Sequence, residues 1–261
     1  MLTVHANGPG LGDALVLTCL LRNVIPPDEP VRIHSAYPQI FAAWPRVEAL
    51  PWQGRQSFPV LNDMAQVREH QVQAMATCLG YPPPERDAIY PELQVSAPCA
   101  DEAYVVIAPR AGAWAWGTKQ WPWQSWKELV RCLDVRGIPV VQIGATADPT
   151  VPGVRAAYLG EPIEQSAIRC KSARVAVTLV SGPMHLATAV GTPVVALFGG
   201  REDPAKTGYA RNVNLTGNAP QGCTPCWQLT CPWRVGDQLP CMQPLTPLRV
   251  AETIATLWRT H

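Results

Sequence analysis

Four cysteines crowd into a short stretch near the end of the sequence. Cys223, Cys226, Cys231 and Cys241 lie within 19 residues, and the first two form a C-x2-C pair. Four thiolates can close a tetrahedral metal site, and sulfur ligands suit both zinc and iron. We therefore expect a structural metal, Zn or Fe. The alternatives are free thiols or two disulfides, which a reducing cytoplasm disfavours.

A glycine-rich turn, GPGLGD, occupies residues 8–13, between a strand expected at 2–6 and a helix expected at 13–24. Glycines let the backbone approach a ligand closely, and a helix start offers N–H groups to an anion. Asp13 falls in the first helical turn, where a carboxylate stabilises the helix dipole. The functional alternative for Asp13 is a general base at the carboxyl edge of the sheet, with Gly12 as a candidate to bind the ligand.

A second bend between a strand and a helix, VSGPMHL, occupies residues 180–186. Amides at such a bend, together with the helix dipole, can cradle a pyrophosphate. His185 could hydrogen-bond a phosphate or a sugar, or it could be structural. The candidate pyrophosphate-binding residues at this bend are Ser181, Gly182, Pro183, Met184 and His185.

A third loop, RAGAWAWGTKQW, covers residues 110–121 after a strand expected at 104–108. Arg110 and Lys119 bring two cations to this loop, and a lysine suits a diphosphate as a point charge. The alternative for Lys119 is an ordinary solvated side chain. Trp114 and Trp116 could stack on a base or a sugar, or pack in the core.

Short apolar runs alternate with helical stretches along the chain. In the second half, strands are expected at 104–108, 139–144, 174–180 and 193–198, and helices at 125–135, 164–173, 185–190 and 248–258. In the first half, a strand is expected at 31–36 and a helix at 62–79, from an Asn62 N-cap to Gly80. The Pro-rich residues 82–103 read as a linker. The alternation predicts an α/β fold with parallel sheets and a ligand site at the carboxyl ends of the strands.

The composition narrows the class of protein. Of 261 residues, 47% are hydrophobic and 16% charged, which suits a packed core and excludes general disorder. A net charge of +1 makes nucleic acid an unlikely partner. No apolar run reaches the ~20 residues of a membrane span. The first residues show no basic segment followed by an apolar one, so we expect a cytoplasmic location.

The three loops together resemble glycosyltransferase family 9, the ADP-heptose:lipopolysaccharide heptosyltransferases and their relatives. The stretch SGPMHLATAVGTPVVALFGG at residues 181–200 is the most specific match. PRAGA at 109–113 and KQWP at 119–122 are similar to the preceding loop of the family. GDAL at 12–15 and LLR at 20–22 are similar to its N-terminal motif. The resemblance covers the C-terminal half well and little of the N-terminal half beyond its opening strand, turn and helix.

The resemblance implies a GT-B fold, two Rossmann-like domains facing a cleft, here with a shortened N-terminal domain. Residues 1–100 would form the acceptor side, and residues 101–261 the nucleotide-sugar side with the four-cysteine segment at 223–241. It also implies an inverting glycosyltransferase without a catalytic divalent metal. Asp13 would deprotonate the acceptor, and Lys119 and the bend at 181–185 would hold the diphosphate. Protein-modifying heptosyltransferases carry an iron-bound cysteine finger, which favours a metal here.

ADP-heptose is the donor that the resemblance implies, with lipopolysaccharide core or a protein hydroxyl as acceptor. One departure bears on activity, since family members usually have Asp before the SGPMH stretch and this chain has Val180. The alternative is therefore a degenerate GT-B scaffold that binds a nucleotide sugar or a partner without turnover.

Overall fold

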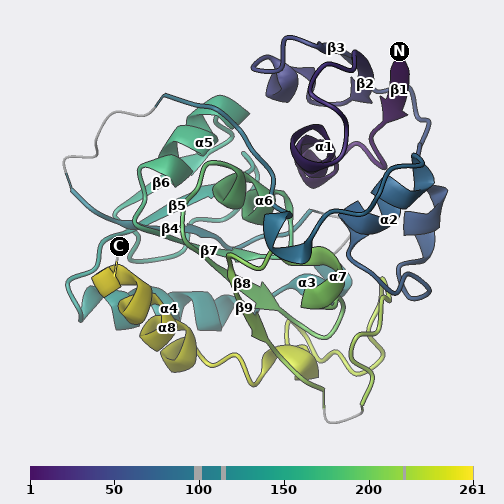
Figure 1. The fold of residues 1–261 in the computed structure, drawn as a ribbon. Helices are drawn as coiled ribbons and strands as arrows, with labels where there is room; N and C mark the ends of the chain where they lie inside the picture. The colour runs from purple at the N-terminus through teal and green to yellow at the C-terminus, as the bar shows by residue number, and fades with distance from the viewer. Residues whose placement is uncertain (97–101, 113–115, 220–221, 261) are drawn as a thin grey trace.

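Two parallel sheets organise the chain (Figure 1). The computed structural model describes residues 1–96, 102–112, 116–219 and 222–260. A three-stranded sheet uses the N-terminal residues, and a six-stranded sheet uses the rest. These sheets confirm the α/β class. The domain boundary predicted at residues 100 and 101 lies outside the described residues and stays a prediction.

The N-terminal sheet has the strand order β1-β2-β3, with every pair parallel. Its strands are β1 (Leu2–His5), β2 (Val31–Ser35) and β3 (Val47–Pro51). Helix α1 (Leu11–Asn23) connects the first two strands, and α2 (Gln71–Cys78) follows later. Short 3-10 helices lie at Pro38–Phe41, Pro59–Asp63 and Arg86–Ala88.

The C-terminal sheet has the order β6-β5-β4-β7-β8-β9 and is also wholly parallel. Its strands are β4 (Val105–Ala108), β5 (Val140–Gly144), β6 (Ala156–Leu159), β7 (Val175–Leu179), β8 (Val194–Phe198) and β9 (Val213–Thr216). The helices are α3 (Trp116–Lys119), α4 (Trp123–Asp134), α5 (Ile163–Lys171), α6 (Gly182–Ala189), α7 (Pro204–Thr207) and α8 (Pro247–Thr260), and a 3-10 turn lies at Pro240–Met242. The order reverses between β4 and β7, and in doubly wound sheets ligands bind at such a switch point.

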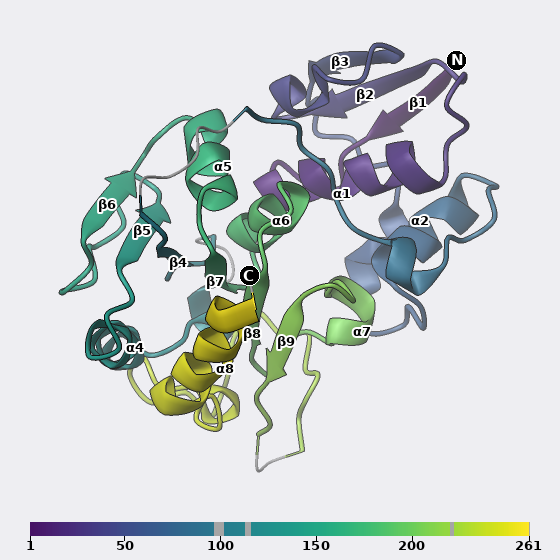
Figure 2. The same cartoon turned by 60° about the vertical axis from the view of Figure 1, so that its left-hand side comes forward.

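Successive residues of each strand face opposite sides of the C-terminal sheet. On β4, Val106 and Ala108 join a core that also contains the buried residues of α1 and α6. Val105 and Ile107 face the second core, which is closed by α4 and α8. Figure 2 shows α4 and α8 together on one face of the sheet, and α5 and α6 on the other. The N-terminal unit therefore packs onto the α6 side.

The helix predicted over residues 62–79 is wrong in its first half. A 3-10 turn ends at Asp63, and α2 begins only at Gln71. His70 is the N-cap, because its Nδ1 accepts a hydrogen bond from the amide of Val72 at 3.2 Å. The predicted end is confirmed, since Gly80 follows the helix with a positive φ of 79°.

The Pro-rich linker is packed against both units where it is described. Ile89 is buried, the amide of Glu92 donates to the hydroxyl of Thr18 in α1, and the amide of Leu93 donates to the carbonyl of Ala189 in α6. The segment therefore ties α1 to α6.

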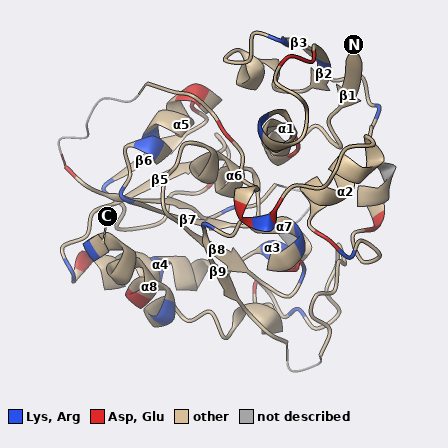
Figure 3. Ribbon diagram, in the orientation of Figure 1, with Lys and Arg blue, Asp and Glu red and all other residues tan. Residues whose placement is uncertain are grey.

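Charged residues of both signs are interspersed over the elements (Figure 3). This distribution agrees with the net charge of +1. Across the described ranges, none of the helices combines the length and the apolar character that a membrane crossing requires.

Candidate functional site

The turn after β1 holds the carboxylate of Asp13 against the backbone. Asp13 is the third residue of α1, and its Oδ2 accepts a hydrogen bond from the amide of Gly10 at 3.2 Å. A Cβ on Gly10 would lie 2.6 Å from that oxygen, so only glycine leaves it room. Burial raises the pKa of the Asp13 carboxyl, while the amide of Gly10 and the charge of Lys119 act in the opposite direction. The carboxylate thus caps its helix and also interacts electrostatically with the C-terminal unit.

The two predicted bends lie directly against each other. A Cβ on Gly12 would come within 2.8 Å of the His185 ring, and one on Gly182 within 3.1 Å of Leu11. These glycines let the first turns of α1 and α6 approach closely. Two loops that are 170 residues apart in the sequence therefore form one place in the fold.

His185 contacts a residue that no sequence motif indicated. Its Nδ1 lies 2.6 Å from the hydroxyl of Tyr209, which is fully buried. Burial lowers the pKa of His185 to about 4. The charge of Glu202 opposes this shift, and that of Lys119 adds to it. The ring is therefore neutral, and its Nε2 is the nitrogen on the Gly12 side.

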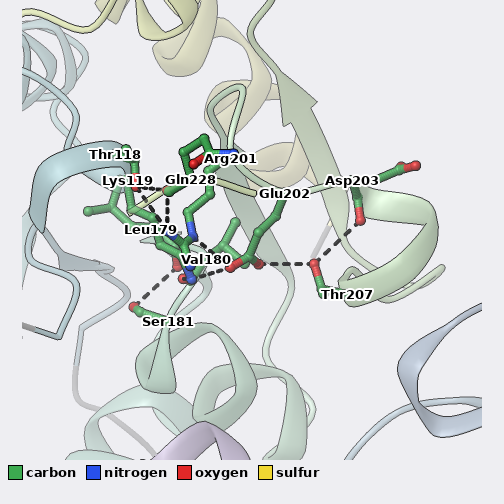
Figure 4. A network of polar contacts seen from close by, with 10 residues as sticks. All are labelled: Thr118, Lys119, Leu179, Val180, Ser181, Arg201, Glu202, Asp203, Thr207 and Gln228. Carbon is green, nitrogen blue, oxygen red and sulfur yellow. Dashed lines mark hydrogen bonds and ion pairs between the residues drawn. The ribbon is translucent and has the colours of Figure 1, made fainter. Parts of the chain in front are cut away.

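Lys119 is buried at the switch point. Its ammonium donates to the carbonyl of Val180 at 3.0 Å and pairs with Glu202 (Figure 4). Val180 and Ser181 follow β7, while Lys119 is the last residue of α3, which follows β4. The interpretation of Lys119 as a solvated surface side chain is therefore wrong, because it is only 8% exposed.

The polar network around Lys119 extends through neighbouring loops. Arg201 donates to the hydroxyl of Thr118 and to the carbonyl of Gln228, and the Thr118 hydroxyl donates to the same carbonyl at 2.9 Å. Glu202 accepts from the hydroxyl of Thr207 at 3.1 Å. A pocket of about 190 Å³ lies beside this network, and Lys119, Arg201, Glu202 and Val180 are among its lining residues. The site combines two cations with one carboxylate.

The remaining donor-site candidates differ in what they can offer. Met184 is fully buried, so its side chain packs in the core. The amides of Met184 and His185 bond to the carbonyl of Ser181, and Pro183 has no amide hydrogen. The amides that α6 can offer to an anion at its start are therefore those of Ser181, its N-cap, and Gly182, its first residue. Arg110 follows β4 and is half-buried, and it is not among the described residues that line the pocket.

All four cysteines of the 223–241 segment line a second pocket, of about 320 Å³. Burial raises the pKa of Cys241, and Cys226 and Cys231 add to that shift. Among the residues that the structure describes, no group of three or more potential ligands is arranged to hold a metal. The amides of Cys226 and Trp227 donate to the carbonyls of Gly200 and Arg201, so the segment borders the Lys119 network.

Sequence reasoning missed Glu202, Arg201 and Tyr209. The first two follow β8 in the run GGRED, and charged residues at the carboxyl end of a parallel strand are a usable signal for a site. Tyr209 gave no comparable signal. For the proposed base stacking, Trp114 lies outside the described residues and the side chain of Trp116 is not described.

This chain has a doubly wound sheet with buried cations at its switch point. That arrangement is typical of α/β proteins that bind nucleotides or other phosphorylated ligands there. The model of glycosyltransferase family 9 (heptosyltransferase) matches residues 56–235, more than half of the chain. The chain belongs to this family.

Individual relatives agree with the family. Lipopolysaccharide heptosyltransferase 1 of Pseudomonas aeruginosa PAO1 is 29% identical over 228 residues, which cover 78% of this chain and 62% of that protein. The chain thus spans less than two thirds of the length of this curated relative.

Solved structures show the same fold. The ADP-heptose lps heptosyltransferase II of E. coli superposes with a TM-score of 0.67 at 17% identity, covering 100% of this chain and 99% of that one. The iron-containing dodecameric glycosyltransferase TibC of enterotoxigenic E. coli H10407 gives 0.67 at 19% identity, covering 99% and 76%. The GT-B fold predicted from the resemblance is confirmed.

Proposed function

We propose that this protein is an inverting glycosyltransferase that moves a sugar from a nucleoside diphosphate donor to a hydroxyl acceptor. One observation carries the proposal: the turn that holds Asp13 packs against the bend at 180–186, and Lys119 donates to the carbonyl of Val180 in that same bend. A carboxylate and a buried cation on either side of a reacting centre can serve as base and as leaving-group stabiliser.

Each residue then has a defined task. The Asp13 carboxylate takes the proton of the acceptor hydroxyl as that oxygen bonds to the anomeric carbon of the sugar. The bond from the same carbon to the diphosphate breaks, and its electron pair leaves with the diphosphate oxygen. Lys119 and the amides of Ser181 and Gly182 stabilise the negative charge that develops there. The ring Nε2 of His185 adds a further polar group on the Gly12 side.

We propose heptose from ADP-heptose as the donor, and lipopolysaccharide core or a protein hydroxyl as the acceptor. Family membership supports this choice. It is also supported by a structure of TibC in complex with ADP-D-beta-D-heptose, whose fold is similar to that of this chain. The cytoplasmic location stays a prediction from the sequence.

A transfer assay tests the proposal. The protein is incubated with ADP-heptose and either acceptor, and release of ADP and labelling of the acceptor are measured. Asp13→Asn should lower transfer at least about 100-fold, the usual contribution of a general base, and should leave ADP affinity within about threefold. Asp63→Asn, which changes an aspartate at the end of a 3-10 turn, is the matched control.

Two results would contradict the proposal. Full transfer by Asp13→Asn would remove the base assignment. ADP binding by the wild type without transfer to either acceptor would favour the scaffold that binds a nucleotide sugar without turnover.

We also propose that Cys223, Cys226, Cys231 and Cys241 hold a structural metal, Zn or Fe. The support is that all four line one pocket, that thiolates are preferred ligands of both metals, and that the related TibC contains iron. The residues fit such a metal in type, and its chemistry there would be to staple the segment against the loop at Gly200. Elemental analysis should find about one metal per chain, lost in Cys226→Ser/Cys231→Ser and kept in Cys78→Ser. An equal metal content in both variants would refute the site.

A further inference from the structure

Glu202 lies between two cations at the carboxyl end of β8. Its Oε1 pairs with the Lys119 ammonium and lies 3.7 Å from Nε of Arg201. The side chains of Lys119 and Arg201 are 9% exposed, and that of Glu202 is 11% exposed. The three charges are therefore largely removed from water. Ionic contacts are stronger in such a buried environment than in solvent.

The contacts that Lys119 and Arg201 make with this carboxylate are contacts that a phosphoryl oxygen can also make. Ammonium and guanidinium groups bind carboxylate and phosphate oxygens in the same way. Lys119, Arg201 and Glu202 all line the pocket at the switch point. Because like charges at close range repel, a diphosphate that reaches Lys119 must move the carboxylate away or share the ammonium with it.

The carboxylate of Glu202 has a second partner besides the cations. Its other oxygen, Oε2, accepts a hydrogen bond from the Thr207 hydroxyl at 3.1 Å. Figure 4 shows Thr207 on the side of the carboxylate away from Lys119. Thr207 belongs to α7, which is capped by Asp203 through the amide of Ala205. This anchor can hold the carboxylate when Lys119 turns to another anion.

We propose that Glu202 is an internal anion that competes with the nucleoside diphosphate for Lys119 and so limits how tightly the site holds that ligand. The inference rests on the proposed function, which gives Lys119 to the diphosphate. On binding, the ammonium exchanges the carboxylate for a phosphoryl oxygen. On release, the ion pair forms again, so the buried charge keeps a counter-ion and the product leaves more readily.

Calorimetric titration with ADP tests the competition through four proteins: the wild type, Glu202→Gln, Lys119→Met and the double variant. Glutamine keeps an acceptor for Thr207 and removes only the charge. Glu202→Gln should bind ADP at least about tenfold more tightly, which corresponds to about 1.4 kcal/mol. In the Lys119→Met background the same change should alter affinity less than about twofold, since coupled residues are not additive.

A second variant probes the anchor. The Thr207 hydroxyl already holds Oε2 in this structure, and this contact matters more once Lys119 has turned to the diphosphate and left the carboxylate. Thr207→Val should therefore weaken ADP binding about threefold, the effect of one modest hydrogen bond. This variant also keeps the inference testable if Glu202→Gln fails to fold. Glu48→Gln, which breaks the exposed ion pair with Arg32, should leave ADP affinity unchanged. Adenosine, which has no phosphate, should bind the wild type and Glu202→Gln equally.

The outcomes separate this inference from the function on which it rests. If the wild type binds ADP and Lys119→Met weakens it, but Glu202→Gln is unchanged or weaker, the competition is overturned and the donor site stands. If the wild type does not bind ADP, or Lys119→Met binds it equally well, both are overturned.

Discussion

His70 and His185 are buried histidines that the fold keeps neutral, and they should make the protein lose stability on mild acidification. Burial lowers the pKa of His70 to about 3, with a further contribution from Arg86, and lowers that of His185 to about 4. The ring of His70 accepts from the amide of Val72 through Nδ1, and its Nε2 lies 3.0 Å from the carbonyl of Gly208. A proton on Nδ1 would face the amide hydrogen of Val72, so the fold strongly disfavours the doubly protonated, charged ring of His70.

The magnitude follows from proton linkage. In the unfolded chain both histidines titrate near pH 6.5, whereas in the native state they stay unprotonated until about pH 4 or below. Below pH 6.5 the unfolded state binds protons that the native state does not, so the free energy of unfolding falls as the pH falls. Each histidine costs about 1.4 kcal/mol per pH unit, and the two together about 4 kcal/mol at pH 5. Asp13 acts in the opposite direction, because its raised pKa lets the native state take up a proton first.

Urea unfolding followed by tryptophan fluorescence at pH 7.5, 6.5, 5.5 and 5.0 measures this loss. His70→Asn, which keeps an N-cap acceptor for α2, should reduce the slope below pH 6.5 by about 1.4 kcal/mol per pH unit. A free energy of unfolding that stays constant between pH 6.5 and 5.0 would show that these rings are not held neutral, and the reasoning would fail.

Three substitutions test the packing around the site. Gly12→Val should cost about 1–3 kcal/mol in urea unfolding, because its Cβ would meet the His185 ring, and a wild-type stability would contradict the close approach. Tyr209→Phe leaves the Nδ1 of His185 without its hydroxyl partner and should cost about 1–3 kcal/mol in the same assay; no loss would mean that the pair is not formed. Gly217→Ala should cost about 3 kcal/mol or more, since a Cβ there would overlap the backbone carbonyl of Cys241, and normal thermal unfolding would exclude that contact.

Local patterns were enough to predict the two junctions between a strand and a helix at the site, but not α3, which carries Lys119, or α7, which carries Thr207. The bends at residues 8–13 and 180–186 each place glycines between a strand and a helix, and both junctions form as expected. Periodicity alone failed at residues 62–79. His70 is fixed by a bond to Gly208, 138 residues away, and this contact sets where α2 begins. Strand β3 was also not expected, because its residues VEALP carry a weak pattern and are fixed by pairing with β2.

The chemistry of the site depends on contacts that no local pattern contains. Lys119 reads equally well as a surface lysine until the fold brings Glu202, 83 residues later, against it. In the same way the hydroxyl partner of His185 is Tyr209, which comes from a loop beyond β8. Residue types thus located Lys119 and the carboxylate of Asp13, while Arg201, the partners of these groups and their protonation states required the three-dimensional arrangement.

The central claim is that the pocket at the switch point holds the diphosphate of the donor through Lys119. Calorimetric titration of the wild type and of Lys119→Met with ADP tests it most directly, with Lys127→Met on α4 as the control. We predict saturable binding by the wild type and by Lys127→Met, and at least about tenfold weaker binding by Lys119→Met. Equal ADP affinity in all three proteins, or no binding by the wild type, would contradict the claim.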